Sequence, residues 1–218
     1  GNDANNILNG GLGNDTLNGS IGIDTVTYEN STVGVSVNLA LTTAQTIQGT
    51  EKDTIKNIEN LTGSDYNDIL KGSTLSNIIN GLDGNDTIIA GTGKTNDIFD
   101  GGDGIDTISY EQATSLVTID LSNISSQVTT GSGSDTITKF ENLTGSKYND
   151  ILNGDSNSNI ILGGAGNDTI NGNGGNDTLD GGAGNDILNG GDGVDTLSYA
   201  TATAAIKVNL STTSAQAT

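Results

Sequence analysis

Several residue types are absent from this chain of 218 residues, which contains no cysteine, proline, methionine, tryptophan or histidine. Without cysteine it has no disulfide framework and no thiol nucleophile. Without histidine it can build neither a Ser-His-Asp triad nor a histidine-ligated zinc site from its own residues. Hydrophobic residues make up 32% of the sequence and aromatic residues 3%, so we expect no large conventional core.

Long apolar runs are also missing. No stretch of about 18 apolar residues could form a membrane-spanning helix. The first residues do not have the pattern of a secretory signal peptide. A signal that has been removed, another route of export, or a position within a longer protein would each account for this.

Basic residues are scarce, with seven lysines and arginines against 27 acidic residues and a formal net charge of −20. Nucleic acids and anionic membranes attract cationic side chains, so this charge argues against both as partners. It favours cations instead. Carboxylates and backbone carbonyls are the ligands of hard ions such as calcium, and we predict a cation-binding protein that is not an enzyme.

Glycine, by contrast, is abundant and follows a pattern. The motif Gly-Gly-x-Gly-x-Asp-x-Leu-x fills residues 181–189 and again residues 190–198. The apolar residue at its eighth position recurs every nine residues, at Leu152, Ile161, Ile170, Leu179, Leu188 and Leu197. A period of nine fits neither a helix nor a simple amphipathic strand. It predicts a solenoid in which each unit is a turn followed by a short strand.

A longer repeat is superimposed on the short one, since residues 24–28 recur 82 positions later at 106–110. It divides the chain into glycine-rich blocks and β-rich spacers, which we predict to form one continuous solenoid. The blocks are residues 1–27, 63–109 and 145–198, and the spacers are residues 28–62, 110–144 and a truncated 199–218. Alternating apolar residues predict spacer strands within 33–41, 117–121 and 206–210. Neither end has the atypical repeat that caps an isolated solenoid, so we expect a segment of a longer protein.

These nonapeptides resemble the RTX calcium-binding repeats of bacterial proteins. The resemblance implies an all-β fold, a right-handed parallel β-roll or β-helix. It also implies that the first six residues of each unit form a turn that holds calcium, and that several calcium ions are bound. Members of the family are exported by type I secretion and fold in extracellular calcium, so the resemblance implies a secreted protein, at the cell surface or free.

The turn residues also suit calcium chemically. Backbone carbonyls that converge on one ion require φ values that glycine adopts at little cost, and the aspartate at the sixth position adds a short carboxylate. The predicted metal-binding aspartates are Asp15, Asp24, Asp68, Asp86, Asp97, Asp106, Asp150, Asp168, Asp177, Asp186 and Asp195. The predicted metal-binding glycines are Gly11, Gly13, Gly84, Gly102, Gly104, Gly164, Gly166, Gly175, Gly182, Gly184, Gly191 and Gly193.

Two nonapeptides make one coil, so turns 18 residues apart are predicted to lie on the same side and share an ion. The predicted pairs are Asp150/Asp168, Asp168/Asp186, Asp177/Asp195, Asp68/Asp86 and, across a two-residue insertion, Asp86/Asp106. Asn6 and Asn159 oppose Asp24 and Asp177, so those two sites are expected to be weaker. Tyrosine replaces the fourth-position glycine in the turns that hold Asp68 and Asp150. The five tyrosines are expected to pack where the coil changes shape.

Two functions remain open. The first is a structural repeat segment of a surface layer, adhesin or fibre, with self-association into a layer or filament. The second is the secretion and folding module of an exported enzyme, such as a serralysin-type protease, a lipase or an alginate epimerase. In that case a catalytic domain would be fused to this segment.

Overall fold

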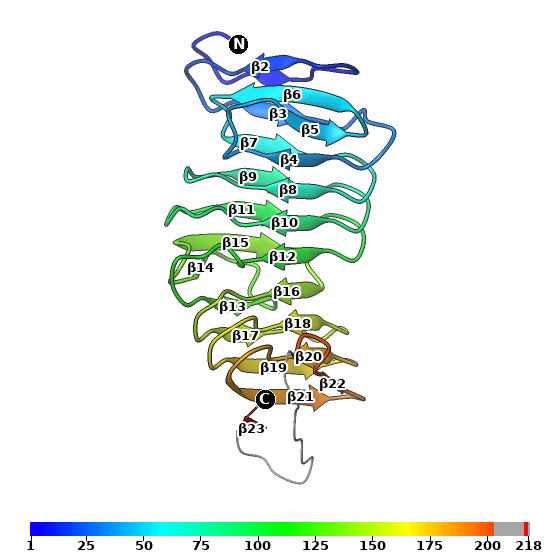
Figure 1. Ribbon diagram of the computed structural model, residues 1–218, viewed down its shortest axis with the longest axis vertical. Coiled ribbons are helices and arrows are strands. Elements are labelled where there is room, and N and C mark those ends of the chain that lie inside the picture. Colours follow the sequence, from blue (N-terminus) through cyan, green and yellow to red (C-terminus); the bar gives the residue numbers. More distant parts are fainter. Residues whose placement is uncertain (203–215, 218) are drawn as a thin grey trace.

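Most nonapeptides fold into a turn followed by a strand of three residues, such as β20 (Thr178–Asp180), whereas β19 (Thr169–Gly174) and β21 (Asn185–Asp192) extend into the adjoining turns. In the computed structural model, which describes residues 1–202 and 216–217, these units stack into a tall column (Figure 1). The long sheets are built from parallel strands, which confirms the predicted all-β parallel solenoid. No helix long and apolar enough to cross a membrane occurs in the described part of the chain.

The chain alternates between two sides of the column. One side carries an eight-stranded sheet, in the order β22 (Thr196–Ser198), β20, β18 (Ile160–Leu162), β16 (Asn142–Thr144), β12 (Thr107–Ser109), β10 (Thr87–Ile89), β8 (Ile69–Lys71) and β4 (Ser36–Asn38). A three-stranded sheet has the order β2 (Thr16–Asn18), β6 (Glu51–Lys56) and β5 (Gln45–Gln48).

The remaining strands form two further sheets. The seven-stranded one has the order β1 (Ile7–Leu8), β3 (Thr25–Thr27), β7 (Asn60–Thr62), β9 (Ile78–Asn80), β11 (Ile98–Asp100), β15 (Ser134–Thr138) and β14 (Gln127–Val128). The five-stranded one has the order β13 (Thr118–Asp120), β17 (Ile151–Asn153), β19 (Thr169–Gly174), β21 (Asn185–Asp192) and β23 (Gln216–Ala217). Among the described strands, the pairs β5–β6, β14–β15 and β21–β23 are antiparallel.

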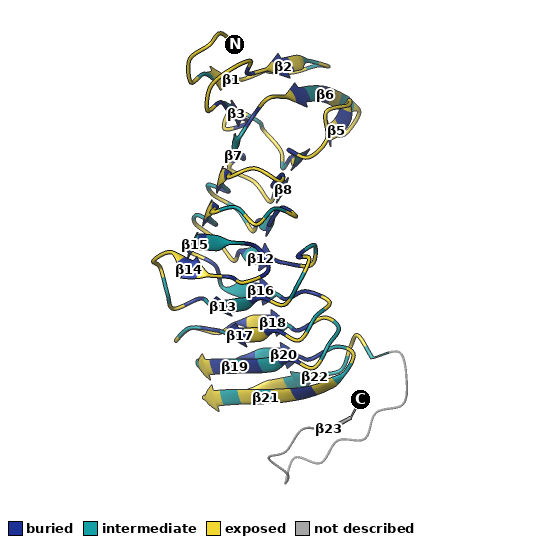
Figure 2. Cartoon of the chain, turned by 90° about the vertical axis from the view of Figure 1, so that its left-hand side faces the viewer, coloured by how far each residue is buried: buried dark blue, intermediate teal, exposed yellow. Residues whose placement is uncertain are grey.

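The core is a narrow ladder of single side chains. Strands in the glycine-rich blocks pair with strands 18 residues away, so Thr169 pairs with both Ile151 and Ile187. The middle residue of each strand points inward because side chains alternate along a strand. Leu70 and Ile88 are fully buried in this way. Figure 2 shows buried segments interleaved with exposed ones along the whole column.

The spacers do not simply continue the coil. In the first spacer, β4 pairs with β8 and not with β2. The hairpin β5–β6 then reverses the chain, so that β6 is the strand that pairs with β2. The second spacer repeats this on the other side, with β13 pairing with β17 and β15 with β11. Strands predicted within 33–41 and 117–121 are thus confirmed as β4 and β13. The strand predicted within 206–210 lies outside the described residues.

A buried glutamine joins each hairpin to the strand beside it. The side-chain oxygen of Gln45 accepts the backbone N–H of Asn38 at 2.7 Å, and its amide nitrogen donates to the carbonyl of Asn38 at 3.0 Å. Gln127 makes the same two contacts with Asp120, at 2.8 and 3.1 Å. A carboxamide carries the same donor and acceptor as a peptide group. Each glutamine therefore satisfies the backbone N–H and carbonyl of one residue in the strand beside the hairpin.

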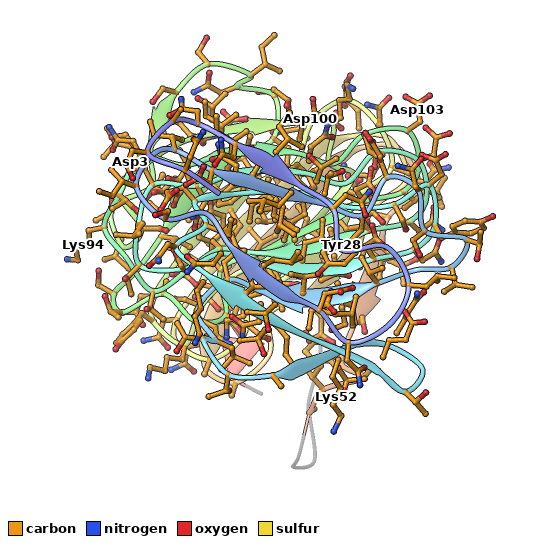
Figure 3. All side chains as sticks on the ribbon, turned by 90° about the horizontal axis from the view of Figure 1, so that it is seen from above. Asp3, Tyr28, Lys52, Lys94, Asp100 and Asp103 are labelled. Atoms are coloured by element: carbon orange, nitrogen blue, oxygen red, sulfur yellow. The ribbon has the colours of Figure 1, made fainter. Side chains whose placement is uncertain are left out.

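Tyrosine hydroxyls satisfy a buried aspartate in each spacer. Tyr28 donates to Asp53 at 2.9 Å, and Tyr110 donates to Asp135 at 3.0 Å. Burial, followed by the nearby carboxylate, raises the pKa of both tyrosines, so both remain protonated donors. Tyr28 lies towards the inside of the column, whereas Asp3, Lys52, Lys94 and Asp103 lie at its periphery (Figure 3). The predicted packing role holds for Tyr28 and Tyr110, but Tyr66 is 47% exposed.

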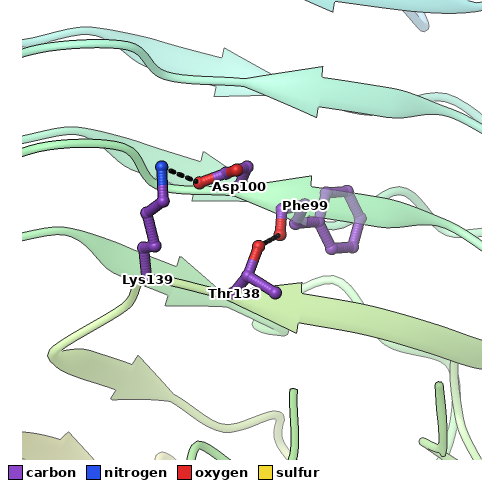
Figure 4. Close-up of polar contacts among 4 residues, drawn as sticks. All are labelled: Phe99, Asp100, Thr138 and Lys139. Atoms are coloured by element: carbon purple, nitrogen blue, oxygen red, sulfur yellow. Dashed lines mark hydrogen bonds and ion pairs between the residues drawn. The ribbon is translucent and has the colours of Figure 1, made fainter. Parts of the chain in front are cut away.

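A left-handed residue ends the long strand of each spacer hairpin. Asn57 follows β6 with φ 50°, and Lys139 follows β15 with φ 59°. Lys139 pairs with Asp100 of β11 at 3.4 Å, and the hydroxyl of Thr138 donates to the carbonyl of Phe99 at 3.2 Å (Figure 4). The lysine side chain is 56% exposed, so the ion pair adds little stability in water.

Candidate metal centre

The glycine-rich turns share a left-handed backbone at their second and fourth positions. In the turn at residues 181–186, Gly182 has φ 82° and Gly184 has φ 145°. We call turns of this kind open turns, and in the described residues they span 10–15, 19–24, 81–86, 101–106, 163–168, 172–177, 181–186 and 190–195. The left-handed conformation was predicted for twelve glycines and occurs in all of them, namely Gly11, Gly13, Gly84, Gly102, Gly104, Gly164, Gly166, Gly175, Gly182, Gly184, Gly191 and Gly193.

Residues other than glycine occupy the second position of three open turns. Ser20, Leu82 and Asn173 have φ values of 86°, 82° and 75°. This backbone costs an L-residue about 1–2 kcal/mol. The turns keep their shape despite that cost.

The sixth-position carboxylates form ladders along the column. In each, Oδ1 accepts the backbone N–H of the sixth residue one coil earlier, as Asp186 does from Asp168 at 2.9 Å. Asp195 accepts from Asp177 in the same way at 3.0 Å. The predicted stacking is confirmed for the other pairs too, which are Asp150/Asp168, Asp68/Asp86 and Asp86/Asp106. The backbone N–H groups of Asn6 and Asn159 donate in the same way to Asp24 and Asp177, so these residues also stack as predicted.

The second carboxylate oxygen of the open turns is the strongest indication of a cation site. Oδ2 is buried without a hydrogen-bond partner in Asp15, Asp24, Asp86, Asp106, Asp168, Asp177 and Asp186. A buried carboxylate oxygen without a partner costs free energy unless a positive charge lies beside it. In the described residues no three acidic side chains are placed to hold one metal ion together, so backbone carbonyls would supply most of the other ligands.

A third set of glycines, missed by sequence reasoning as site residues, makes room for this oxygen. A Cβ at Gly181 would lie 2.3 Å from Oδ2 of Asp186, and one at Gly172 would lie 2.1 Å from Oδ2 of Asp177. The first position of the turn must therefore lack a side chain. The signal was the first letter of the motif, which is glycine in every open turn.

Close stacking excludes side chains from the other glycine positions. A Cβ at Gly182 would lie 1.9 Å from the carbonyl oxygen of Gly164, and one at Gly184 would lie 1.6 Å from that of Gly166. Each open turn therefore lies directly against the carbonyls of the coil before it. Gly11 and Gly13 differ, because nothing lies within 4 Å of a Cβ at either position.

Five other turns close on themselves, and we call them capped turns. They span residues 1–6, 63–68, 72–77, 145–150 and 154–159. In each, the backbone N–H of the second residue donates to the side chain of the sixth, as Ser64 does to Asp68 and Ser146 to Asp150, both at 2.6 Å. The structure thus places the predicted ligands Asp68 and Asp150 in turns that already satisfy their carboxylates.

Asp97 belongs to the nonapeptide enlarged by two residues. Its Oδ1 accepts the backbone N–H of Asn77 at 2.7 Å and a longer contact from the Thr95 hydroxyl at 3.4 Å. It is 3% exposed and stacks on Asp135, whose Oδ1 accepts its backbone N–H at 3.0 Å. Asp97 therefore continues a ladder without lying in an open turn.

Four acids at the ends of the ladders were not predicted. Glu59 and Glu141 accept the backbone N–H of Asp24 and Asp106, at 2.9 and 2.8 Å. Asp53 accepts the backbone N–H of Asp15 at 2.9 Å, and Asp135 accepts that of Asp97 at 3.0 Å. The available signal was the repetition of these acids 82 residues apart.

Burial opposes ionisation of the stacked carboxylates. Together with a smaller contribution from neighbouring carboxylates, it raises the pKa of Asp86 and Asp168 to about 7 and that of Asp106 to about 6. Hydrogen bonds from the backbone offset only part of the increase. A bound cation would favour the ionised form.

The fold and these turns define a parallel β-solenoid with turns whose buried carboxylates suit cations. Comparison with family models gives four matches to the RTX calcium-binding nonapeptide repeat, at residues 1–26, 62–95, 140–170 and 162–197. They cover more than half of the chain, and the chain belongs to this family. A search of curated proteins found no match. RTX repeats bind Ca²⁺, and the partnerless carboxylate oxygens and the backbone without side chains fit that ion.

Two alanine substitutions separate backbone strain from crowding. Gly11→Ala should cost about 1–2 kcal/mol in the free energy of unfolding, because it places an L-residue in the left-handed region. Gly182→Ala has nearly the same φ, but its Cβ would also meet the Gly164 carbonyl, so it should cost more. Urea unfolding in saturating calcium measures both. Equal losses would show that crowding between coils contributes nothing.

Acidification should act in opposite directions with and without calcium. The pKa of Asp86 and Asp168 is about 7 in the metal-free fold, against about 3.9 in an unfolded chain. Protonation thus stabilises the metal-free fold fully below about pH 4, and that contribution is lost as the pH rises through 7. Calcium needs ionised carboxylates, so its affinity should fall as the pH drops below 7. Calcium titrations and circular dichroism of the stripped protein, on both sides of that pH, measure these effects. An affinity that does not change with pH would contradict the prediction.

Proposed function

We propose that this chain is a structural segment of a secreted or cell-surface bacterial protein, without catalytic activity, which folds when it meets calcium outside the cell. RTX repeats are typical of type I-secreted bacterial proteins. The observation that carries the proposal is the row of buried Oδ2 atoms without partners in the open turns. Until cations bind, these buried carboxylate oxygens have neither a hydrogen-bond donor nor a positive charge beside them.

Charge repulsion explains why calcium should control folding. Each ladder brings carboxylates into register, as in Asp150, Asp168 and Asp186, in a chain of net charge −20. The narrow core cannot offset this repulsion together with the entropy of ordering so many glycines. An ion that binds only the folded chain shifts the equilibrium towards it. Low calcium inside the cell would then keep the chain unfolded for export.

The absence of catalysis is supported by what the buried acids contact. Asp168, Asp177 and Asp186 accept backbone N–H groups of neighbouring turns, and Asp53 and Asp135 accept tyrosine hydroxyls. The repeat therefore accounts for these carboxylates. Paired acids of a glycosidase would instead face a substrate cleft.

Chelation tests the proposed function. In EGTA the chain should give the circular dichroism spectrum of a largely disordered polypeptide, and added calcium should restore a β spectrum. Magnesium is the control, since its shorter and more rigid coordination suits these turns less. A β spectrum that persists unchanged after chelation would contradict calcium-dependent folding.

A structural role would involve stacking between coils of the same repeat. Within the described residues, β2 pairs only with β6, and no atom lies within 4 Å of a Cβ built at Gly11 or Gly13. In the same part of the chain, β22 pairs only with β20. Unpaired strand edges attract further strands. A coil of the same repeat, in this protein or in another molecule, could stack on the turn that contains Gly11 and Gly13.

Association in calcium tests this role. Sedimentation of the calcium-loaded chain should show larger species as concentration increases. Gly11→Ala should remain monomeric, because its new Cβ is tolerated within one molecule but would meet a carbonyl of a stacked coil, as at Gly182. A wild-type chain that stays monomeric at high concentration would contradict end-to-end stacking.

A further inference from the structure

We propose that the fourth residue of each turn decides whether that turn uses its sixth side chain as a calcium ligand. Glycine at this position gives an open turn, and any other residue gives a capped turn whose sixth side chain is no ligand. The inference rests on the proposed binding of calcium by the open turns. It removes Asp68 and Asp150 from the predicted ligands.

The fourth position separates the two kinds of turn completely within the described residues. Open turns have glycine there, namely Gly13, Gly22, Gly84, Gly104, Gly166, Gly175, Gly184 and Gly193. Capped turns have a side chain there, namely Ala4, Tyr66, Leu75, Tyr148 and Asn157. The second position does not separate them, since Ser20 is in an open turn and Ser64 in a capped one.

Backbone conformation explains this division. The fourth-position glycines have φ values from 104° at Gly175 to 155° at Gly104. Residues with a Cβ rarely adopt this region, whereas Leu82 shows that a φ near 80° at the second position is tolerated. None of the fourth residues of the capped turns has a positive φ. Such a turn closes, and its second N–H reaches the sixth side chain.

In the capped turn of residues 63–68, hydrogen bonds occupy both carboxylate oxygens of Asp68. Oδ1 of Asp68 accepts from the Val35 N–H and the Ser64 hydroxyl, both at 2.7 Å, and Oδ2 accepts from the Ser64 N–H at 2.6 Å. Both oxygens therefore have donors. A cation would have to displace these short hydrogen bonds.

The turn of residues 145–150 repeats the arrangement, and its sequence differs from that of residues 63–68 at one position. Oδ1 of Asp150 accepts from the Val117 N–H at 2.8 Å and the Ser146 hydroxyl at 2.9 Å, and Oδ2 accepts from the Ser146 N–H at 2.6 Å. Asp65 precedes Tyr66 in the first case, and Lys147 precedes Tyr148 in the second. The same hydrogen bonds form although the neighbouring charge has the opposite sign.

Asparagine takes the sixth position in the other capped turns, at Asn6, Asn77 and Asn159. Nδ2 of Asn77 donates to the carbonyl of Glu59 at 2.6 Å, and Nδ2 of Asn159 donates to that of Glu141 at 2.7 Å. Their Oδ1 atoms accept the N–H of the second residue of their own turn. Neutral asparagine is thus a native residue of capped turns.

The experiment compares aspartates that are matched within each of two ladders. Asp68→Asn and Asp150→Asn alter capped turns, and Asp86→Asn and Asp168→Asn alter the open turns stacked directly on them. Bound calcium is counted by equilibrium dialysis with elemental analysis, and the calcium-loaded fold is checked by circular dichroism. Asp68→Asn and Asp150→Asn should bind as many ions as the wild type, whereas Asp86→Asn and Asp168→Asn should lose ions.

Loss of an ion in Asp68→Asn or Asp150→Asn would overturn the inference. If the open-turn variants fail to fold, the capped-turn variants compared with the wild type still decide, because asparagine is already native at Asn77 and Asn159. A wild-type chain that binds no calcium would contradict the proposed function instead. The two failures are therefore distinguishable.

Discussion

A buried carboxylate oxygen with no hydrogen-bond donor is the constraint on which this solenoid depends. In the open turns, Oδ1 of the aspartate is held by the neighbouring coil, and Oδ2 folds back into its own turn. That geometry requires a first residue without a side chain and a coil-to-coil stacking close enough to bury the oxygen. It also requires a positive charge, since desolvation makes the ionised carboxylate costly. Folding and cation binding are thereby coupled.

Glycine serves this arrangement in three physically different ways. At the first position it leaves room for a carboxylate, and at the second it leaves room for the carbonyl of the coil before. At the fourth it supplies backbone angles that other residues rarely adopt. Leu82 and Asn173 show that the second position tolerates a side chain where the local stacking allows it.

Side chains replace the cation wherever the spacers interrupt the open turns. Tyr110 and Thr129 donate hydroxyls to Asp135, and Gln127 pairs with the backbone of Asp120 in the manner of a peptide group. These neutral partners satisfy buried polar groups without calcium. The column is therefore continuous, although its means of neutralising buried charge changes along its length.

The nine-residue period was enough to predict a solenoid and the stacking of its turns, and the resemblance to RTX repeats implied a parallel β-roll. Parallel strands in register must place residues one coil apart on each other, so the pairing of Asp186 with Asp168 follows from their spacing of 18. The capped state of Asp68 and Asp150 was less evident. Tyrosine at the fourth position indicated a departure, but only the coordinates show that the turn closes on its own carboxylate.

Contacts across the spacers could be found only in the tertiary structure. Asp53 lies on Asp15, and Asp135 on Asp97, although each pair is 38 residues apart. These separations depend on a hairpin that reverses the chain and fills the gap behind a displaced strand. A sequence period describes regular stacking because each unit meets the next at a constant interval. It cannot describe a reversal, because the pairing of a reversed strand depends on which backbone groups nearby are still unpaired.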